Sequence, residues 1–240
     1  MSIALLNYQE HVTEYGVHWN FFATLSVVTI LALAAGVPAR RGVLVGCFIL
    51  VLHQGLLNHA GLATYVRSHP RSNFVHANKE GVVSTLGYYG LFLVGTGVGD
   101  SLARRRGRRA WVRALGLVSL GSLLAYATVF AAWDYEPPSR RITNAPYLIF
   151  TIAYNLQQLA SFMAADLVVG PGPQPLATAV NRNQLLVFIV ANLATGSVNL
   201  TMDTLSASTG LAISVLLVYL AAVLSLAFAL EIGGITLKFW

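Results

Sequence analysis

The sequence predicts an all-α fold, a polytopic membrane helix bundle of about seven transmembrane helices. Two observations support this prediction. Hydrophobic residues make up 56% of the chain and charged residues only 10%, whereas about a quarter of the residues in a soluble domain are charged. The apolar residues also gather in runs close to the roughly 20 residues that a helix needs to cross a bilayer. Because lipid offers the backbone no hydrogen-bond partners, such runs are expected to be helical.

Seven apolar runs are the candidate spans, and we expect residues 1–240 to form a single integral-membrane domain. The predicted spans are residues 19–37, 43–64, 81–99, 114–133, 146–165, 184–204 and 210–232. Pro171, Pro173 and Pro175 occupy alternate positions, which predicts a loop between the fifth and sixth spans. Gly95 and Gly99, four residues apart in the third span, predict close packing of that helix against a neighbour.

The distribution of positive charge predicts the orientation of the spans. The net charge is +6, and six of the fifteen basic residues lie in the short loop 100–113. With the N-terminus outside, the cytoplasmic connections carry ten basic residues and the opposite side carries five. Cytoplasmic loops are usually rich in Lys and Arg, so this orientation is favoured and nucleic acid is not an expected partner. A phosphate-binding patch is the alternative interpretation of the arginine-rich loop.

A short stretch before the first span carries two of the nine acidic residues and two of the six histidines. On a helix, His11, Glu14, Tyr15 and His18 fall within about 100° of one face. Ionisable groups beside a membrane span often mark a site, although an interfacial helix with ordinary aromatic and histidine anchors is the alternative. No second cluster of clear spacing accompanies these residues, and Cys47 is the single cysteine. We therefore expect no metal site.

Further polar residues gather, in the predicted orientation, on the side away from the arginines. His53 lies near the middle of the second span, and the polar loop 67–80 leads into the third. Two later spans each carry a polar stripe about 80° wide. The stripes are Tyr147, Thr151, Tyr154, Gln158 and Ser161 in the fifth span, and Asn192, Thr195, Asn199 and Asp203 in the sixth. We expect one outward-facing polar site, with hydrogen bonds between helices as the alternative for each stripe.

Three segments resemble the inositol acyltransferases of GPI-anchor biosynthesis. They are YQEHVTEYGVHWNFF at residues 8–22, ANKEG at 77–81 followed by LGY at 86–88, and NLATGSVNLTMDT at 192–204. Members of that family are multi-pass proteins of the endoplasmic reticulum that transfer a fatty acyl chain from acyl-CoA to the inositol of glucosaminyl-phosphatidylinositol. The resemblance implies this location, and the orientation predicted from the charges then gives a luminal N-terminus and a cytosolic C-terminus. It also implies palmitoyl-CoA as co-substrate and no bound cofactor. The segments belong to the C-terminal half of family members, so a missing N-terminal half is an expected partner.

Acyl transfer to a hydroxyl needs a base, donors that stabilise the thioester oxyanion, and exclusion of water. His11 or His18, oriented by Glu14, is the candidate base, because imidazole titrates near neutral pH. The candidate catalytic residues are His11, Glu14, His18, Lys79, Glu80 and Asp203, and the candidate substrate-binding residues are Arg71, Asn78, Asn192 and Asn199. The sequence shows no Ser–His–Asp set with a nucleophile elbow, so we expect direct transfer without an acyl-enzyme.

Two alternative functions stay open. A non-enzymatic lipid transporter or scramblase would also line a cavity with polar stripes, but it should carry ionisable groups near the midplane of several spans. Here His53 alone is predicted to lie deep in the membrane. The second alternative is a catalytically incomplete fragment of the acyltransferase, which the coding sequence upstream of Met1 would reveal.

Overall fold

The computed structural model describes residues 15–170, 174–204 and 206–237, and within these ranges every regular element is a helix. Six of the described helices are long and apolar enough to cross a membrane, and a seventh, α3 (Phe21–Ala35), is shorter. The prediction of an all-α polytopic membrane protein is therefore confirmed. The described residues divide into two compact units, a larger one of residues 15–170 and a smaller one of residues 174–204 and 206–237.

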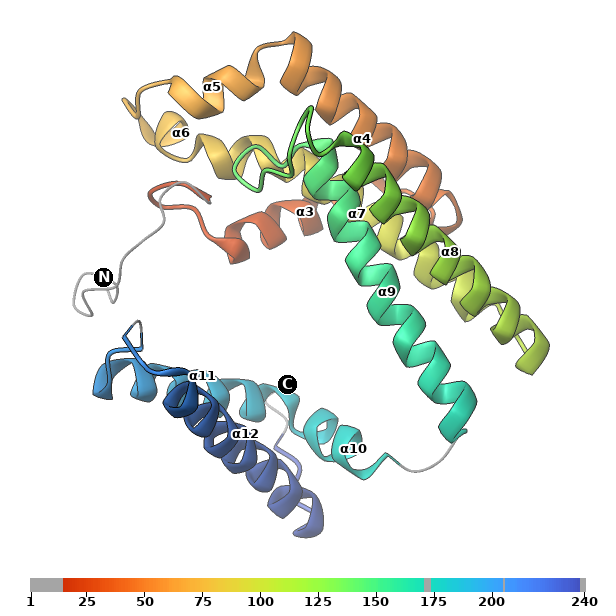
Figure 1. Ribbon diagram of the computed structural model, residues 1–240, viewed down its shortest axis with the longest axis vertical. Helices are drawn as coiled ribbons and strands as arrows, with labels where there is room; N and C mark the ends of the chain where they lie inside the picture. The colour runs from red at the N-terminus through yellow and green to blue at the C-terminus, as the bar shows by residue number, and fades with distance from the viewer. Residues whose placement is uncertain (1–14, 171–173, 205, 238–240) are drawn as a thin grey trace. The chain divides into compact units, whose positions relative to one another are not determined.

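In the larger unit, α7 is the central helix (Figure 1). It packs against α3, α4, α5, α6 and α9, while α8 packs along α9. The bounds after α3 are η1 Ala39–Arg41, α4 Gly42–His59, α5 Leu62–Ser68, α6 Phe74–Ala77, α7 Lys79–Ala103, α8 Arg108–Ala132 and α9 Ala145–Val169. Val28, Ile49, Tyr89 and Leu93 form the core between α3, α4 and α7.

The smaller unit consists, among its described residues, of α10 (Pro175–Arg182), α11 (Gln184–Thr201) and α12 (Thr209–Ile232). Ala179, Val187, Val223 and Ala227 form its core. The prediction of a loop through Pro175 is wrong, because Pro175 is the first residue of α10. At that position the backbone N–H has no partner within the helix, so proline is tolerated. Pro171 and Pro173 lie outside the described residues.

The second predicted span is too long at its end. Helix α4 stops at His59, and Gly61, in the left-handed conformation with φ of 70°, turns the chain into α5. The predicted polar loop 67–80 likewise contains α6 and the first turn of α7. Lys79 and Glu80 are therefore held by a helix rather than by a loop.

The closest helix contact is between α4 and α7, and glycines make it possible. A Cβ at Gly46 would lie 2.7 Å from the carbonyl oxygen of Gly90, and a Cβ at Gly97 would lie 2.5 Å from the backbone nitrogen of Val43. By contrast, a Cβ at Gly95 or Gly99 would meet nothing within 4 Å. The prediction that Gly95 and Gly99 pack against a neighbouring helix is thus wrong. The side of α7 that contacts α4 carries other glycines.

Replacing Gly46 by valine should destabilise the larger unit, because the added side chain has no space beside Gly90. Overpacking of this kind costs about 1–3 kcal/mol. We expect a lower melting temperature in detergent than for the wild-type protein. Gly55→Val in the same helix is the matched control, since a Cβ there meets nothing within 4 Å. Equal melting temperatures for the two variants would contradict the α4–α7 contact.

Candidate functional site

The segment before α3 is docked onto the junction between α6 and α7. Gly16 has a φ of 122°, which favours glycine, and a Cβ on it would lie 2.6 Å from the Cα of Asn78. The backbone N–H of Val17 donates to the carbonyl oxygen of Ala77 at 3.1 Å. The backbone N–H of His18 donates to Oδ1 of Asn78 at 2.7 Å. This short segment is therefore fixed by α6 and α7.

The backbone of this segment contradicts part of the prediction that the polar residues before the first span share one helical face. Tyr15 and His18 do not share a helical face, because Gly16 interrupts the helix and the next two N–H groups bond to residues 77 and 78. The imidazole of His18 is exposed and stacks on Phe74, with 6.1 Å between the ring centroids. His11 and Glu14 lie outside the described residues.

A charged cluster lies where α7 begins. The Glu80 side chain is 0% exposed, and its carboxylate accepts two hydrogen bonds from Arg71, at 2.6 and 3.0 Å. Nε of Arg141 lies 3.7 Å from the same carboxylate. Lys79 is also buried, and its Nζ donates to the carbonyl oxygen of His69. A buried carboxylate is tolerated only when it is paired in this way.

The fold thus brings together four of the predicted site residues, Arg71, Asn78, Lys79 and Glu80, with the backbone of His18. The other three described candidates belong to the smaller unit. There Asn192 donates to the carbonyl oxygen of Phe188 at 2.7 Å, and Asp203 accepts from Ser206 at 2.7 Å. Asn199 lines a separate groove of about 300 Å³ between α11 and α12.

Two arginines of the loop before α9 complete the cluster, although in the sequence they stand out only by their charge. Arg141 donates to the carbonyl oxygens of Val66 at 3.3 Å and Arg67 at 3.1 Å, besides facing Glu80. Arg140 donates to the hydroxyl of Tyr15 at 2.7 Å, with its guanidinium 5.1 Å from the centre of that ring. Two adjacent arginines shortly before a span were the signal that could have identified them.

The loop that carries these arginines is itself tied to α4. Gln54 of α4 accepts from the backbone N–H of Ala145 at 2.6 Å and donates to Glu136 at 3.1 Å. Asn144 donates to the same carboxylate at 3.2 Å and accepts from the backbone N–H of Ser139 at 2.8 Å. The position of Arg140 and Arg141 therefore depends on polar residues of α4 and of the loop.

His53 lies at the other side of this loop. It is fully buried, and a Cβ on Gly87 would lie 3.3 Å from its Nε2. Within the described residues, no hydrogen bond of good geometry reaches either ring nitrogen of His53 or the hydroxyl of Thr143, although the backbone of Ile142 and Thr143 lies close to the imidazole. Thr143 also has a positive φ of 52°. Buried polar groups without partners and strained backbone both occur more often at functional sites than elsewhere.

An apolar groove of about 560 Å³ runs between α3, α7 and α9. Tyr15 and Tyr88 line one end, and the Tyr88 hydroxyl lies 3.4 Å from that of Tyr147. Leu102 and Leu159 line the other end. Because Tyr15 contacts both Arg140 and the groove, it connects the charged cluster to the apolar space.

The side chains of the predicted polar stripe in the fifth span do not share one kind of partner. Thr151 and Ser161 donate to carbonyl oxygens of their own helix, at 2.9 and 3.0 Å, and Tyr154 is exposed. Among the described residues, Tyr147 is the one member of this stripe whose side chain bonds to a side chain of another helix. Its hydroxyl lies next to that of Tyr88.

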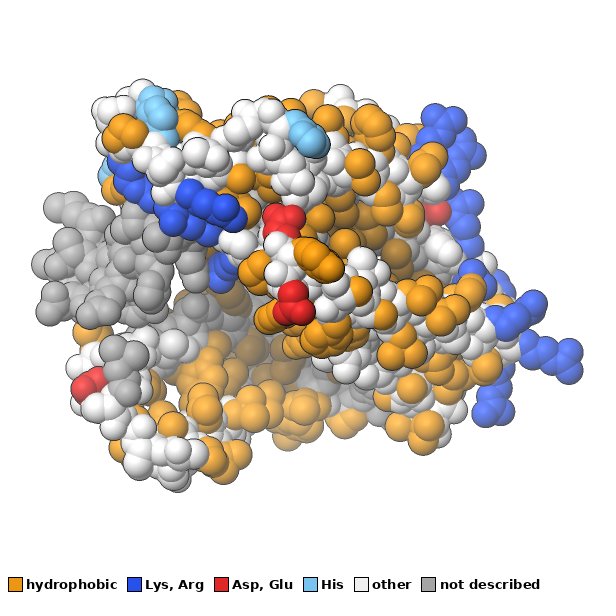
Figure 2. Space-filling model, turned by 45° about the horizontal axis from the view of Figure 1, so that its top comes forward, with side chains coloured by type: hydrophobic (Ala, Val, Ile, Leu, Met, Phe, Trp, Pro, Cys, Tyr) orange, Lys and Arg blue, Asp and Glu red, His pale blue; other side chains and the backbone are white. Residues whose placement is uncertain are grey.

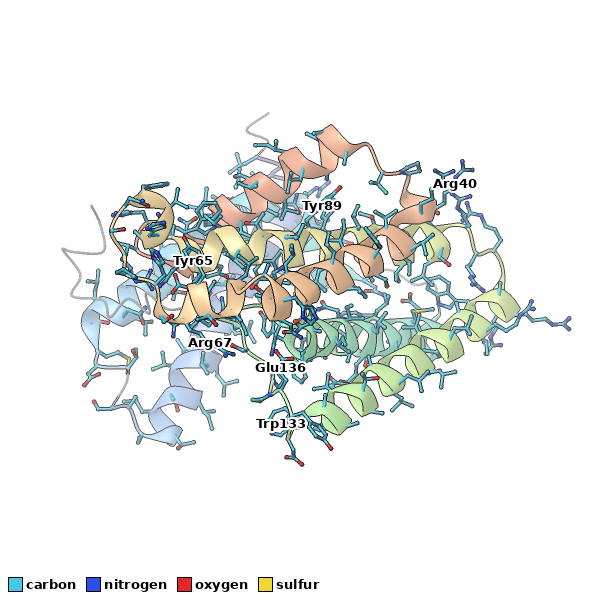
Figure 3. The ribbon with its side chains drawn as sticks, turned by 90° about the horizontal axis from the view of Figure 1, so that it is seen from above. Arg40, Tyr65, Arg67, Tyr89, Trp133 and Glu136 are labelled. Carbon is cyan, nitrogen blue, oxygen red and sulfur yellow. The ribbon has the colours of Figure 1, made fainter. Side chains whose placement is uncertain are left out.

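Basic side chains gather in two separate groups on the face that Figure 2 shows. In Figure 3, Arg67 and Tyr65 lie at one end of the larger unit and Arg40 lies at the other, beside the connection between α7 and α8. That connection holds Arg104, whose guanidinium bonds to Asp100 at 2.8 Å. The charged cluster and the arginine-rich connection are therefore at opposite ends of α7.

The arrangement suits a ligand with an anionic or carbonyl-bearing head and an apolar chain. Arg71, Arg141 and Lys79 outnumber the Glu80 carboxylate that they surround, so the cluster favours negative charge next to it. The adjoining groove offers apolar walls. In the part of the chain that the structure describes, no three histidine, cysteine or acidic side chains come close enough to hold a metal ion.

Comparison with known proteins identifies the family. The model of the GWT1 family matches residues 1–230. The chain is 34% identical over 238 residues to the phosphatidylinositol-glycan biosynthesis class W protein of Dictyostelium discoideum, covering 98% of this chain and 48% of that protein. It is 35% identical over 275 residues to GPI-anchored wall transfer protein 1 of Aspergillus oryzae, covering 99% and 54%.

A mammalian protein is similar over the same length. The chain is 29% identical over 287 residues to the glucosaminyl-phosphatidylinositol-acyltransferase PIGW of Bos taurus, covering 100% of this chain and 57% of that protein. The chain thus spans about half the length of the curated relatives that it matches. The resemblance seen in the three sequence segments is confirmed, and the chain belongs to the GWT1 family.

Proposed function

We propose that this protein acts in GPI-anchor biosynthesis as an acyltransferase. It transfers a palmitoyl chain from acyl-CoA to the inositol hydroxyl of glucosaminyl-phosphatidylinositol. Membership of the GWT1 family and the names of the relatives support this proposal. The structural observation that carries it is the cationic cluster around Glu80, placed at one end of an apolar groove. A charged lipid headgroup and a long acyl chain need these two surroundings side by side.

In the proposed reaction, the inositol oxygen bonds to the thioester carbon as the hydroxyl proton passes to a base. The carbon–sulfur bond then breaks, and the CoA thiolate leaves and takes up a proton. Arg71 and Lys79 are the donors for the lipid phosphate or the oxyanion, with Asn78 beside them. Glu80 serves to hold Arg71 in place, since the two groups share two hydrogen bonds. His11 or His18 with Glu14 is the proposed base, and Asn192, Asn199 and Asp203 are proposed to meet the substrate.

Replacing Lys79 by methionine should reduce acyl transfer by about 100-fold or more, because loss of one donor to a developing oxyanion has an effect of that order. The measurement is transfer of labelled palmitate from palmitoyl-CoA to glucosaminyl-phosphatidylinositol in proteoliposomes. Arg106→Met, in the connection between α7 and α8, is the control and should retain the wild-type rate. The melting temperature of each variant distinguishes lost chemistry from lost fold.

Unchanged transfer by Lys79→Met would remove Lys79 from the mechanism. If the wild-type protein, with the N-terminal half of a relative present, moves fluorescent lipids between leaflets and never acylates them, the scramblase is the better description and the proposed function fails.

We also propose that the N-terminal half of family members completes the site, since the chain covers 48% of the relative from Dictyostelium discoideum. Palmitate transfer should then rise at least tenfold when the 240-residue chain is co-expressed with that half of a relative. The measurement is the same proteoliposome assay with and without the second polypeptide. Full turnover by the 240-residue chain alone would show that its own residues suffice.

The proposed location is the endoplasmic reticulum membrane, with a luminal N-terminus and a cytosolic C-terminus. Arg106 should then face the cytosol and Ser72 the lumen, in accord with the positive-inside rule. Single cysteines at these positions, in a Cys47→Ala background, test the orientation in sealed microsomes. A membrane-impermeant maleimide should label Arg106→Cys at once, and Ser72→Cys only after the membrane is permeabilised. Immediate labelling of Ser72→Cys would contradict the orientation.

A further inference from the structure

Two glycines form part of the floor of the groove between α3, α7 and α9. Gly95 and Gly99 both line it, and a Cβ on either would meet nothing within 4 Å. Elsewhere on α7, Gly90 and Gly97 are required by the close approach of α4. Within the described residues, helix packing therefore does not account for the missing side chains at 95 and 99. Glycine also lowers the stability of a helix by about 1 kcal/mol relative to alanine. What these two glycines provide is open space in the groove.

The lining of the groove changes from polar to apolar along its length. Tyr15, Tyr88 and Thr151 lie toward the charged cluster, whereas Val98, Leu102 and Leu159 lie toward the arginine-rich end. Thr151 and Asn155 donate to carbonyl oxygens of α9, at 2.9 and 2.8 Å, so neither directs a polar group that lacks a partner at the groove. The groove thus suits a ligand whose polar end is at Tyr88 and whose tail is apolar.

The size of the groove selects a single linear chain. From Tyr88 to Leu102, α7 rises by about 21 Å, at about 1.5 Å per residue. A bound peptide helix of that length, with a diameter of about 10 Å, would occupy roughly 1,600 Å³. The groove, at about 560 Å³, is too small to hold one. An extended hydrocarbon chain advances about 1.25 Å per carbon, from a carbon–carbon bond of about 1.5 Å. About 16 or 17 carbons therefore match the length of the groove.

We propose that this groove holds the acyl chain of the donor thioester and that Gly95 and Gly99 set the chain length it accepts. This inference rests on the proposed acyltransferase function. The thioester lies at Tyr88, and the chain extends along α7 over Gly95 and then Gly99. These glycines are about 10 and 16 Å beyond Tyr88, which corresponds to about 8 and 13 carbons.

A side chain at either glycine should shorten the preferred donor by a defined amount. In Gly95→Leu, the ratio of kcat/KM for octanoyl-CoA to that for palmitoyl-CoA should rise at least tenfold. In Gly99→Leu, lauroyl-CoA should become the preferred donor and palmitoyl-CoA should be lost. Both variants should fold, since leucine favours a helix more than glycine does and no atom lies within 4 Å of the added Cβ.

Gly116→Leu in α8 is the matched control, because a Cβ there also meets nothing within 4 Å and Gly116 does not line the groove. Its chain-length profile should equal that of the wild-type protein. The assay uses the protein in proteoliposomes, with the N-terminal half of a relative present if turnover requires it. Octanoyl-, lauroyl-, myristoyl- and palmitoyl-CoA are compared at equal concentration.

Binding is measured separately from turnover, so that the two proposals can fail independently. Each acyl-CoA is used to displace a fluorescent palmitoyl probe from the purified protein. Weaker displacement by palmitoyl-CoA in Gly99→Leu, with displacement by lauroyl-CoA retained, supports the groove even if no transfer occurs. An equal loss for all chain lengths, or a change in preference for the tails of the acceptor lipid in place of the donor, overturns the inference.

Discussion

The pairing of the buried Glu80 carboxylate with two arginines is the interaction on which the rest of the larger unit depends. A charge that is wholly removed from solvent is stable only with its partners in place, and here the partners come from different parts of the chain. Arg71 precedes α6, Arg141 lies in the loop before α9, and Glu80 itself is in the first turn of α7. The neighbouring stretches before α6 and at the start of α7 are thereby fixed, together with the distant loop before α9, around one point at the end of α7.

The backbone around that point is held by the same groups. Arg71 also donates to the carbonyl oxygen of Ala77 at 2.6 Å, and Ala77 accepts from Val17 at 3.1 Å. Arg141 reaches back to the end of α5 through the carbonyl oxygens of Val66 and Arg67. The segment before α3, the end of α5 and the α6–α7 junction are therefore coupled through two guanidinium groups. Removal of Glu80 would leave both guanidinium groups without the carboxylate that they face.

Much of this fold could be predicted from the sequence, because apolar runs of span length have one solution in lipid. The third to seventh spans lie where the hydropathy placed them, with ends that differ by a few residues. The failures concern glycine. Gly16 and Gly61 break helices through backbone conformation, while Gly95 and Gly99 have the spacing of a packing motif but face the groove. Spacing alone does not say which side of a helix meets a neighbour.

The candidate site shows the same division. Lys79 and Glu80 were identified because they stand in a recognisable segment, and the structure places them with Arg71 and Asn78. Arg140 and Arg141 escaped notice because their partners, Tyr15 and Glu80, are 125 and 61 positions away in the sequence. Such pairings depend on how α9 is seated against α4 and α7. No local pattern in the chain encodes that placement.

The short length of α3 has a consequence for the surrounding lipid. Its 15 residues span about 22 Å, whereas the hydrocarbon core of a bilayer is about 30 Å thick. A span shorter than the bilayer is accommodated by local thinning of the membrane. Because α3 follows the segment bound to Asn78 and forms one wall of the groove, such thinning would bring the headgroup layer toward the groove mouth. Under the proposed function, the headgroup of the lipid substrate would then stay in the hydrated interface near the charged cluster, and only the hydrocarbon would have to enter the protein.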